Sequence, residues 1–317
     1  MARVLITRPM TDAVTARAVL EFGAEFRTAT TPMTHADMVA ALRDYDLVVP
    51  TLGDMFSAEV FAEGSEPRCR LLANFGVGYN HIDVAAARAV GVEVTHTPGA
   101  VTDATADIAL TLMLMTARRA GEGERLLRSG AWQGWHPTQM LGMHLTGKRL
   151  GVVGLGRIGD AIARRAHFGF GMEIAYVARS PKTTAYPSER AVDLRALASS
   201  VDMLVLAVPG GGDTRHLINA DVLAAMKPSA LLINIARGEV VDEAALIAAL
   251  DAGQIAGAGL DVYEFEPKVP ETLRAMEQVT LLPHLGTATE EVRSAMGHMA
   301  LDNLAAHLAG RELPNRV

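Results

Sequence analysis

Three glycines have the spacing of a phosphate-binding loop. The segment Gly154-Leu155-Gly156-Arg157-Ile158-Gly159 follows an apolar run and precedes a stretch with helical character. In this pattern the first glycine permits a tight turn, the second lets the backbone approach a pyrophosphate, and the third lets the helix pack closely on the strand. The start of the helix adds N–H donors and a partial positive charge. The segment therefore predicts a dinucleotide site rather than a turn that binds no ligand.

The residues after the next apolar run indicate which dinucleotide is bound. An acidic residue about twenty positions beyond the first glycines would bind the ribose 2′-hydroxyl of NAD(H). Here the run that ends at Val177 is followed by Arg179, Ser180 and Lys182, without Asp or Glu. These side chains can bind a 2′-phosphate, and arginine offers a planar set of donors. We expect a preference for NADP(H), with NAD(H) as the second choice; the alternative is that Arg179 is an ordinary surface residue.

The elements that must position these residues alternate regularly between strand and helix. Most predicted strands are continuous apolar runs, as in parallel sheets covered on both faces, so the fold class is α/β. The predicted strands are Arg3–Thr7, Asp46–Val49, Leu71–Asn74, Val92–Thr95, Arg149–Val153, Glu173–Val177, Met203–Val208, Ala230–Ile235, Gly257–Asp261 and Val279–Leu282. The predicted helices include Asp12–Glu21, Ala36–Arg43, Val101–Arg118, Arg157–His167, Asp242–Leu250 and Thr287–Ala309.

Length, charge and cysteine content narrow the class of protein. The 317 residues suggest two domains, with a boundary near Thr97-Pro98-Gly99. A net charge of −7 disfavours nucleic-acid and membrane-surface partners. No apolar run approaches the roughly 20 residues of a membrane-spanning helix. The single cysteine, Cys69, excludes an internal disulfide and a cysteine-rich metal site. We expect a cytoplasmic protein without a metal centre.

Four more segments carry a resemblance to a known family. They are Asn74–Asp83, Asn234–Asp242, Gly259–Pro267 and Leu282–Thr289. With the glycine loop, their order and spacing resemble the D-isomer-specific 2-hydroxyacid dehydrogenases, most closely the glyoxylate/hydroxypyruvate reductases. The resemblance implies two Rossmann-like domains with parallel sheets. A cofactor domain, residues 99–286, would be inserted into a flavodoxin-like substrate domain made of residues 1–98 and 287–317, with the active site in the cleft between them.

The resemblance also implies the catalytic residues of an NADPH-dependent reduction of small 2-keto acids. His284 would be the general acid, a role that suits a side chain titrating near neutral pH. Glu266 would orient the imidazole, with Glu264 in the same segment as its rival. Arg237 would bind the substrate's carboxylate and carbonyl oxygen through two parallel donors. The backbone N–H groups of Val77 and Gly78 would bind the other side of the carboxylate.

Further positions match residues that line the cofactor in this family. Besides the glycine loop and the residues after Val177, they are Thr105, Pro209, Thr214, Ile235, Asp261 and Gly286. Trp132 and Trp135 lie where similar reductases place aromatic residues near a homodimer interface, so Trp135 is expected either to contact substrate or only to pack that interface. One departure from the family pattern is the glycine triplet at positions 210–212, which predicts a mobile loop.

Two other functions remain open on the sequence. The same scaffold could serve a dehydrogenase of another small acid, such as formate or phosphite. It could also serve a dinucleotide-sensing interaction protein that resembles the family's corepressor members. The presence of Arg237, Glu266 and His284 together argues against the second alternative. A panel of keto acids tested with NADPH would separate these functions.

Overall fold

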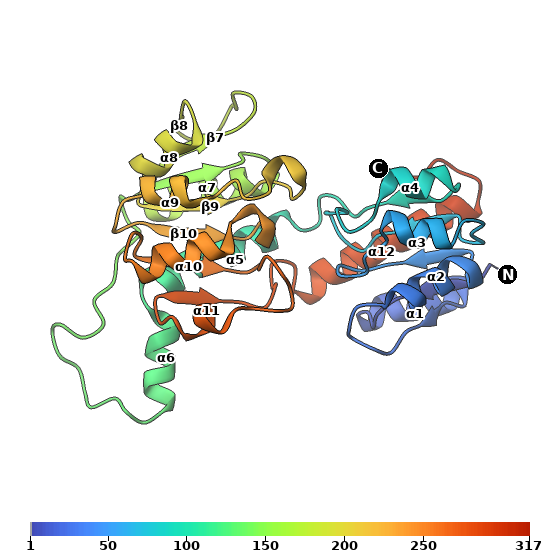
Figure 1. The fold of residues 1–317 in the computed structure, drawn as a ribbon, viewed down its shortest axis with the longest axis horizontal. Helices are drawn as coiled ribbons and strands as arrows, with labels where there is room; N and C mark the ends of the chain where they lie inside the picture. Colours follow the sequence, from blue (N-terminus) through green and yellow to red (C-terminus); the bar gives the residue numbers. More distant parts are fainter. Residues whose placement is uncertain (1) are drawn as a thin grey trace. The chain divides into compact units, whose positions relative to one another are not determined.

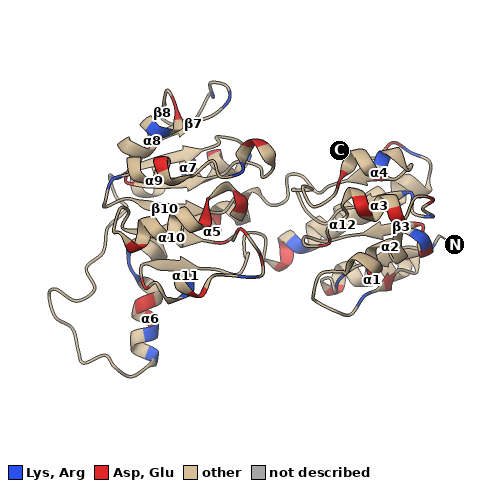
Figure 2. Cartoon of the chain, in the orientation of Figure 1, with Lys and Arg blue, Asp and Glu red and all other residues tan. Residues whose placement is uncertain are grey.

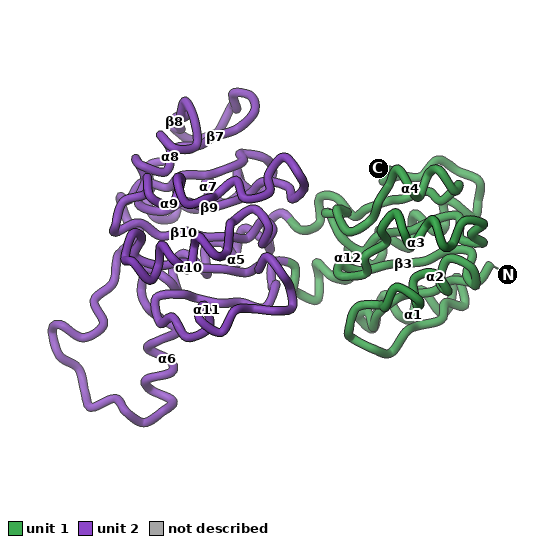
Figure 3. The backbone as a smooth tube through the Cα atoms, viewed as in Figure 1, with its two compact units in different colours: residues 1–101, 287–317 green, residues 102–286 purple. Residues whose placement is uncertain are grey.

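In the computed structural model, which describes residues 2–317, the named strands form two separate parallel sheets (Figure 1). The chain divides into two units (Figure 3). Unit 1 contains the chain up to Val101 together with Thr287–Val317, and unit 2 is Thr102–Gly286. The boundaries expected from the sequence were after residues 98 and 286. The first one lies three residues earlier than the boundary in the structure, where the helix α5 begins at Thr102.

Unit 1 has a five-stranded sheet in the order β2-β1-β3-β4-β5, which is the flavodoxin-like order. Its strands are β1 Val4–Ile6, β2 Glu25–Phe26, β3 Leu47–Val49, β4 Leu71–Ala73 and β5 Glu93–Thr95. Its helices are α1 Asp12–Phe22, α2 His35–Asp44, α3 Ala58–Glu63, α4 Val84–Ala89 and α12 Glu290–Leu308. Residues of α1 and α12 share one apolar core with the sheet, and residues of α2, α3 and α4 share another.

Unit 2 has a seven-stranded sheet in the order β12-β11-β10-β9-β6-β7-β8, with its reversal of strand order between β6 and β9. Its strands are β6 Arg149–Val153, β7 Glu173–Val177, β8 Ser188–Arg190, β9 Met203–Leu206, β10 Leu231–Asn234, β11 Gly257–Leu260 and β12 Val279–Leu281. Ligands of open α/β sheets bind at the carboxyl ends of the strands near such a reversal. The glycine loop follows β6 and therefore lies at this point.

The sheet of unit 2 is covered on both faces, as the continuous apolar runs predict. Its helices are α5 Thr102–Ala117, α6 Ala120–Arg128, α7 Arg157–Phe170, α8 Leu194–Ser200, α9 Ala220–Ala225, α10 Glu243–Asp251 and α11 Glu271–Ala275, with the 3₁₀ turns η1 Gly212–Thr214 and η2 Gly238–Val240. Val205 and Ile233 pack with α5 and α7, whereas their neighbours Leu204 and Leu232 pack with α8, α9 and α10. No helix within residues 2–317 is both long enough and apolar enough to cross a bilayer.

The α/β prediction is confirmed, and the strands predicted from apolar runs are present with the same bounds or slightly shorter ones. Two strands were missed, β2 and β8. Both are edge strands of two or three residues whose side chains are mostly exposed, so neither produces an apolar run. The C-terminal helix α12 belongs to unit 1, where Gly297 lets it approach Val14 of α1 so closely that a Cβ would overlap the valine.

Candidate active site

His284 and Glu266 form a hydrogen-bonded pair at the carboxyl edge of the unit 2 sheet. Glu266 lies beyond the end of β11 and His284 lies beyond the end of β12. The imidazole Nδ1 is 2.9 Å from the Glu266 Oε2. Because Nδ1 is bound to the carboxylate, Nε2 is the ring atom left to exchange a proton with a ligand. The backbone of His284 has a φ of 55°, in the left-handed region that non-glycine residues seldom adopt.

Asp261 holds the turn that carries this strained histidine. Its carbonyl oxygen accepts the N–H of His284 at 3.0 Å. Its carboxylate accepts the N–H groups of Leu285 at 2.6 Å and Gly286 at 2.8 Å. Burial raises the pKa of Asp261, while these two amides and the His284 charge oppose that rise. The hydroxyl of Thr105 on α5 donates to the Gly286 carbonyl oxygen at 3.1 Å, so these cofactor-lining candidates form one hydrogen-bonded group.

The two candidate carboxylates of the 264–266 segment point to different partners. Glu266 accepts the Tyr263 N–H at 3.0 Å through its other oxygen, Oε1. Burial alone would raise the pKa of Glu266, but His284, the Tyr263 amide and the Arg237 charge together lower it. Glu264 instead binds His216 Nε2 at 2.7 Å and Arg215 Nη2 at 3.0 Å. In the structure it is therefore Glu266, and not Glu264, that is hydrogen-bonded to His284.

Arg237 follows β10 and is a largely buried cation with spare donors. Its Nη1 donates to the Ala236 carbonyl oxygen at 2.6 Å, and its buried Nε has no hydrogen-bond partner among the described residues. Burial lowers the pKa of Arg237, and the charges of Glu266 and Glu239 partly offset this effect. A Cβ at Gly238 would overlap the backbone of Tyr263, so only glycine lets this loop pack against the loop of Glu266. A buried guanidinium with an unused donor is suited to bind an anion.

The glycine loop has the geometry that the sequence pattern predicts. Gly154 has a φ of +94°, and a Cβ there would lie 2.7 Å from the Ala207 carbonyl oxygen. At Gly159 a Cβ would overlap the Gly154 carbonyl oxygen. A Cβ at Gly156, the N-cap of α7, would meet no heavy atom within 4 Å. The first and third glycines thus serve packing, while the second leaves open space at a helix N-terminus, which fits a dinucleotide pyrophosphate.

The turn after β7 exposes the three residues proposed to select the cofactor, Arg179, Ser180 and Lys182. The Lys182 N–H donates to the Tyr176 hydroxyl at 2.9 Å. A second guanidinium, that of Arg190, reaches the same turn and donates to the Ala178 carbonyl oxygen at 3.0 Å. Sequence reasoning missed Arg190 because it lies on the unpredicted strand β8. Its only sequence signal is a basic residue eleven positions beyond Arg179.

The remaining cofactor candidates of unit 2 lie in the same row of loops. Leu155 is buried at the end of β6, whereas Arg157 and Ile158 begin α7 with partly or fully exposed side chains. Thr214 donates its hydroxyl to the Pro209 carbonyl oxygen at 2.7 Å, which closes the loop after β9. Ile235 is buried directly after β10. No group of three or more His, Cys, Asp or Glu side chains within residues 2–317 could hold a metal ion.

Val77 and Gly78 lie in unit 1, on the loop that follows β4. The Asn74 side-chain amide donates to the carbonyl oxygens of Gly76 at 3.2 Å and Gly78 at 3.0 Å. The ring Nδ1 of His96 is 3.0 Å from the Val77 carbonyl oxygen. Because the carbonyl groups are bound from within unit 1, the backbone conformation that presents the N–H groups is fixed. Sequence reasoning gave His96 no chemical role, since the contact joins the residue after β5 to the β4 loop and has no local signal.

Trp132 and Trp135 lie on a long segment after α6 that projects from the sheet of unit 2 (Figure 1). Their side chains are 48% and 79% exposed, and the only hydrogen bond of either indole within the described residues is from Trp132 to Gln139. The helix α6 carries both charge signs (Figure 2) and buries no residue. Within the described residues, no hydrogen bond or ring contact joins Trp135 to His284 or Arg237.

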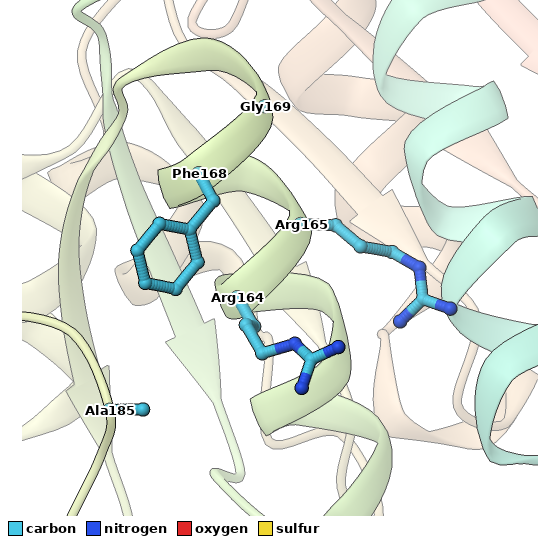
Figure 4. Close-up of a pocket in the computed structure, with 5 residues that line it drawn as sticks. All are labelled: Arg164, Arg165, Phe168, Gly169 and Ala185. Atoms are coloured by element: carbon cyan, nitrogen blue, oxygen red, sulfur yellow. The ribbon is translucent and has the colours of Figure 1, made fainter.

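A cavity of about 600 Å³ lies elsewhere in unit 2 and is distinct from this site. It is lined by Arg164, Arg165, Phe168, Gly169 and Ala185 (Figure 4). Arg165 is already paired with Asp103 at 2.8 Å and Asp107 at 3.0 Å. Since Phe168 is eleven residues beyond the start of α7, it lies roughly 16 Å along the helix from the glycine loop. The cavity therefore belongs to the opposite end of α7.

Comparisons with known proteins agree with this geometry. Residues 110–286 match the family described as D-isomer specific 2-hydroxyacid dehydrogenase, NAD binding domain. A glyoxylate reductase of Thermococcus kodakarensis is 46% identical over 88% of this chain and 85% of its own length. A glyoxylate reductase of Pyrococcus furiosus is 42% identical over 99% and 95%. The structure also resembles an NADPH-dependent glyoxylate/hydroxypyruvate reductase of Sinorhizobium meliloti in complex with NADP and malonate, with a TM-score of 0.88, 38% identity and coverage of 100% and 96%.

Proposed function

This chain belongs to the D-isomer specific 2-hydroxyacid dehydrogenase family, and from that premise we propose that it reduces small 2-keto acids, glyoxylate and hydroxypyruvate first, with NADPH. It is an oxidoreductase that uses a nicotinamide dinucleotide. The observation that carries the proposal is the position of Glu266. This carboxylate is hydrogen-bonded to the imidazole of His284, and its negative charge favours the protonated form of Arg237. A proton donor and an anion-binding cation therefore share one carboxylate.

The reaction assigns a separate task to each side chain. The reduced nicotinamide supplies a hydride when it is bound. Arg237 binds the carboxylate and the carbonyl oxygen of the keto acid, which fixes the substrate and polarises the carbonyl. His284 donates a proton from Nε2 to that oxygen as the carbonyl carbon is reduced, and the neutral imidazole then takes a proton from water. The N–H groups of Val77 and Gly78 bind the other side of the substrate carboxylate.

Glu266 orients the His284 ring for proton transfer. An adjacent carboxylate favours the charged imidazolium, and the bond to Nδ1 keeps Nε2 directed outward. The lowered pKa of Glu266 keeps this carboxylate ionised at neutral pH. A positioned general acid accelerates such a step by about 10²–10⁴-fold.

The preference for NADPH is supported by the cations around the turn after β7. Arg179 and Lys182 are exposed there, and Arg190 hydrogen-bonds the same turn. No acidic side chain follows β7 to bind a ribose 2′-hydroxyl. The structure of the Sinorhizobium meliloti reductase contains NADP, which supports this preference. In this proposal residues 99–286 bind the cofactor and carry Arg237 and His284, while residues 1–98 and 287–317 form the substrate domain, which contributes the Val77 and Gly78 N–H groups.

The test is NADPH oxidation followed by absorbance against a panel of small 2-keto acids. Glyoxylate and hydroxypyruvate should react fastest, and NADPH should give a higher kcat/KM than NADH. Reduction of an oxidised dinucleotide by formate or phosphite would instead favour the other dehydrogenases of this scaffold. Tight dinucleotide binding without turnover of any acid would favour a sensing protein.

We also propose that the protein is a cytoplasmic homodimer joined through the projecting segment after α6. Leu127 near the end of α6 and Trp132, Trp135 and Leu141 after it are all exposed, and several exposed apolar side chains along one segment favour a protein contact. Light scattering should show a dimer, and Trp135→Ala should weaken it. If Trp135→Ala left the preference between glyoxylate and hydroxypyruvate unchanged, the residue would only pack the interface.

A further inference from the structure

The glycine triplet after β9 lies against the loop of Arg237. The N–H of Gly211 donates to the Glu239 carboxylate oxygen Oε1 at 2.8 Å. The same 3₁₀ segment, η2, begins directly after Arg237 and contains Glu239. A side chain that follows β10 therefore binds the backbone of the loop that follows β9, at two neighbouring strands of the sheet.

The three glycines differ in what they require. A Cβ at Gly210 would lie 2.7 Å from the Glu239 Oε1 and 2.8 Å from the Arg237 Cγ. Gly211 has a φ of +126°, which L-residues rarely adopt. A Cβ at Gly212 would meet no heavy atom within 4 Å. The triplet is therefore not simply flexible, because its first member permits close packing on the stem of Arg237 and its second makes the bond to Glu239.

The negative charge of Glu239 also acts on the Arg237 guanidinium. Arg237 is largely buried, its Nε has no hydrogen-bond partner among residues 2–317, and Glu239 is one of the two carboxylates whose charge favours its protonated form. The other is Glu266, which is engaged with His284. One carboxylate thus contacts the backbone of the 209–214 loop and stabilises the cation beside it.

We propose that Glu239 is a positioning residue that fixes the loop Pro209–Thr214 against Arg237, so that one carboxylate sets both the cofactor-facing loop and the substrate-binding guanidinium. The proposal rests on the proposed function, which assigns the loop to the cofactor and Arg237 to the keto acid. A loop fixed in this way holds the cofactor-lining backbone and the stem of Arg237 in one arrangement before either ligand binds.

The first experiment compares alanine substitutions at two glycines of unit 2. Gly210→Ala should raise the dissociation constant of NADPH, measured by its fluorescence, and the KM for glyoxylate, each about tenfold, as for a lost hydrogen bond to a charged group. Gly169→Ala near the end of α7 is the control and should change both less than about twofold, since its Cβ meets open space and lies outside the proposed site. Equal effects of the two substitutions would overturn the proposal.

The second experiment removes or conserves the acceptor. Glu239→Ala should speed hydrogen exchange of residues 209–214 in the cofactor-free protein. It should also raise the dissociation constant of NADPH and the KM for glyoxylate, each about tenfold. Glu239→Gln keeps an oxygen for the Gly211 N–H and should restore most of the exchange protection and of the cofactor affinity. Thermal unfolding confirms that each variant is folded. Unchanged exchange in Glu239→Ala, or no rescue by glutamine, would contradict the proposal.

These readouts separate this inference from the proposed function. Hydrogen exchange and NADPH binding do not depend on which keto acid is reduced. If the native protein turned over none of the acids, the proposed function would fail, while faster exchange in Glu239→Ala would still show that Glu239 anchors the loop. If the native protein were active and exchange were unaffected, only the role of Glu239 would fail.

Discussion

The two sets of loops proposed to bind substrate are held in different ways. In unit 2, the loops after β10, β11 and β12 are held by ionisable side chains, among them Asp261, Glu266 and Arg237. In unit 1, the loop after β4 is held by the amide of Asn74 and the ring of His96, both bound to backbone carbonyl oxygens. One unit thus supplies titratable chemistry and the other supplies backbone geometry. Substitutions and pH should therefore change turnover through unit 2 and mainly substrate affinity through unit 1.

The largest effect should come from the proton donor. His284→Gln removes the general acid and should lower kcat for glyoxylate by about 10²–10⁴-fold, with NADPH affinity little changed. His216→Gln is a matched control, since His216 also pairs with a glutamate in unit 2, at 2.7 Å from Glu264. Steady-state kinetics that showed equal losses in the two variants would remove His284 from the chemistry.

The second largest effect should come from the guanidinium of Arg237. Arg237→Lys keeps the charge but loses the two parallel donors, so kcat/KM should fall about 10- to 100-fold, chiefly through KM. Arg215→Lys, at an exposed arginine paired with Glu264, serves as the control and should have a small effect. A KM within twofold of the native value in Arg237→Lys would show that substrate binds elsewhere.

The carboxylate behind His284 should change the pH profile. Because the pKa of Glu266 is lowered, it is an anion at neutral pH and stabilises the imidazolium. Glu266→Gln removes the negative charge that faces Nδ1 of His284. The alkaline limb of kcat/KM should move to lower pH by about one unit, or ~1.4 kcal/mol. Glu264→Gln should leave the limb in place, and the same shift in both variants would contradict the pairing.

The smallest effect should come from unit 1. His96→Ala removes one hydrogen bond to the Val77 carbonyl oxygen and should raise the KM for glyoxylate about five-fold, or ~1 kcal/mol. Neither kcat nor NADPH affinity should change much, because no ionisable group of the reaction is altered. His35→Ala, at a surface histidine paired with Glu63, is the control. A loss in kcat rather than KM would show that the units do not divide the work in this way.

Local sequence patterns predicted much of this molecule. The apolar runs located the long strands, and the glycine spacing predicted the tight turn at Gly154 and the close packing at Gly159 that the geometry shows, while the pyrophosphate role of Gly156 stays a prediction. The strands β2 and β8 were missed because short exposed edge strands leave no apolar pattern. Arg190 was missed together with β8. The glycine triplet was predicted to be mobile, whereas Gly211 is hydrogen-bonded to Glu239.

The sequence by itself determined which residue types stand after each strand, because strand, turn and helix signals act over a few neighbouring residues. Only the tertiary structure decided which of these residues meet. The resemblance implied the pairing of His284 with Glu266, but no local pattern predicts it. This pairing, the Gly211 bond to Glu239 and the left-handed turn held by Asp261 each join loops that follow different strands. Such contacts depend on the order of strands in the sheet, which brings residues that are distant in the chain to one edge.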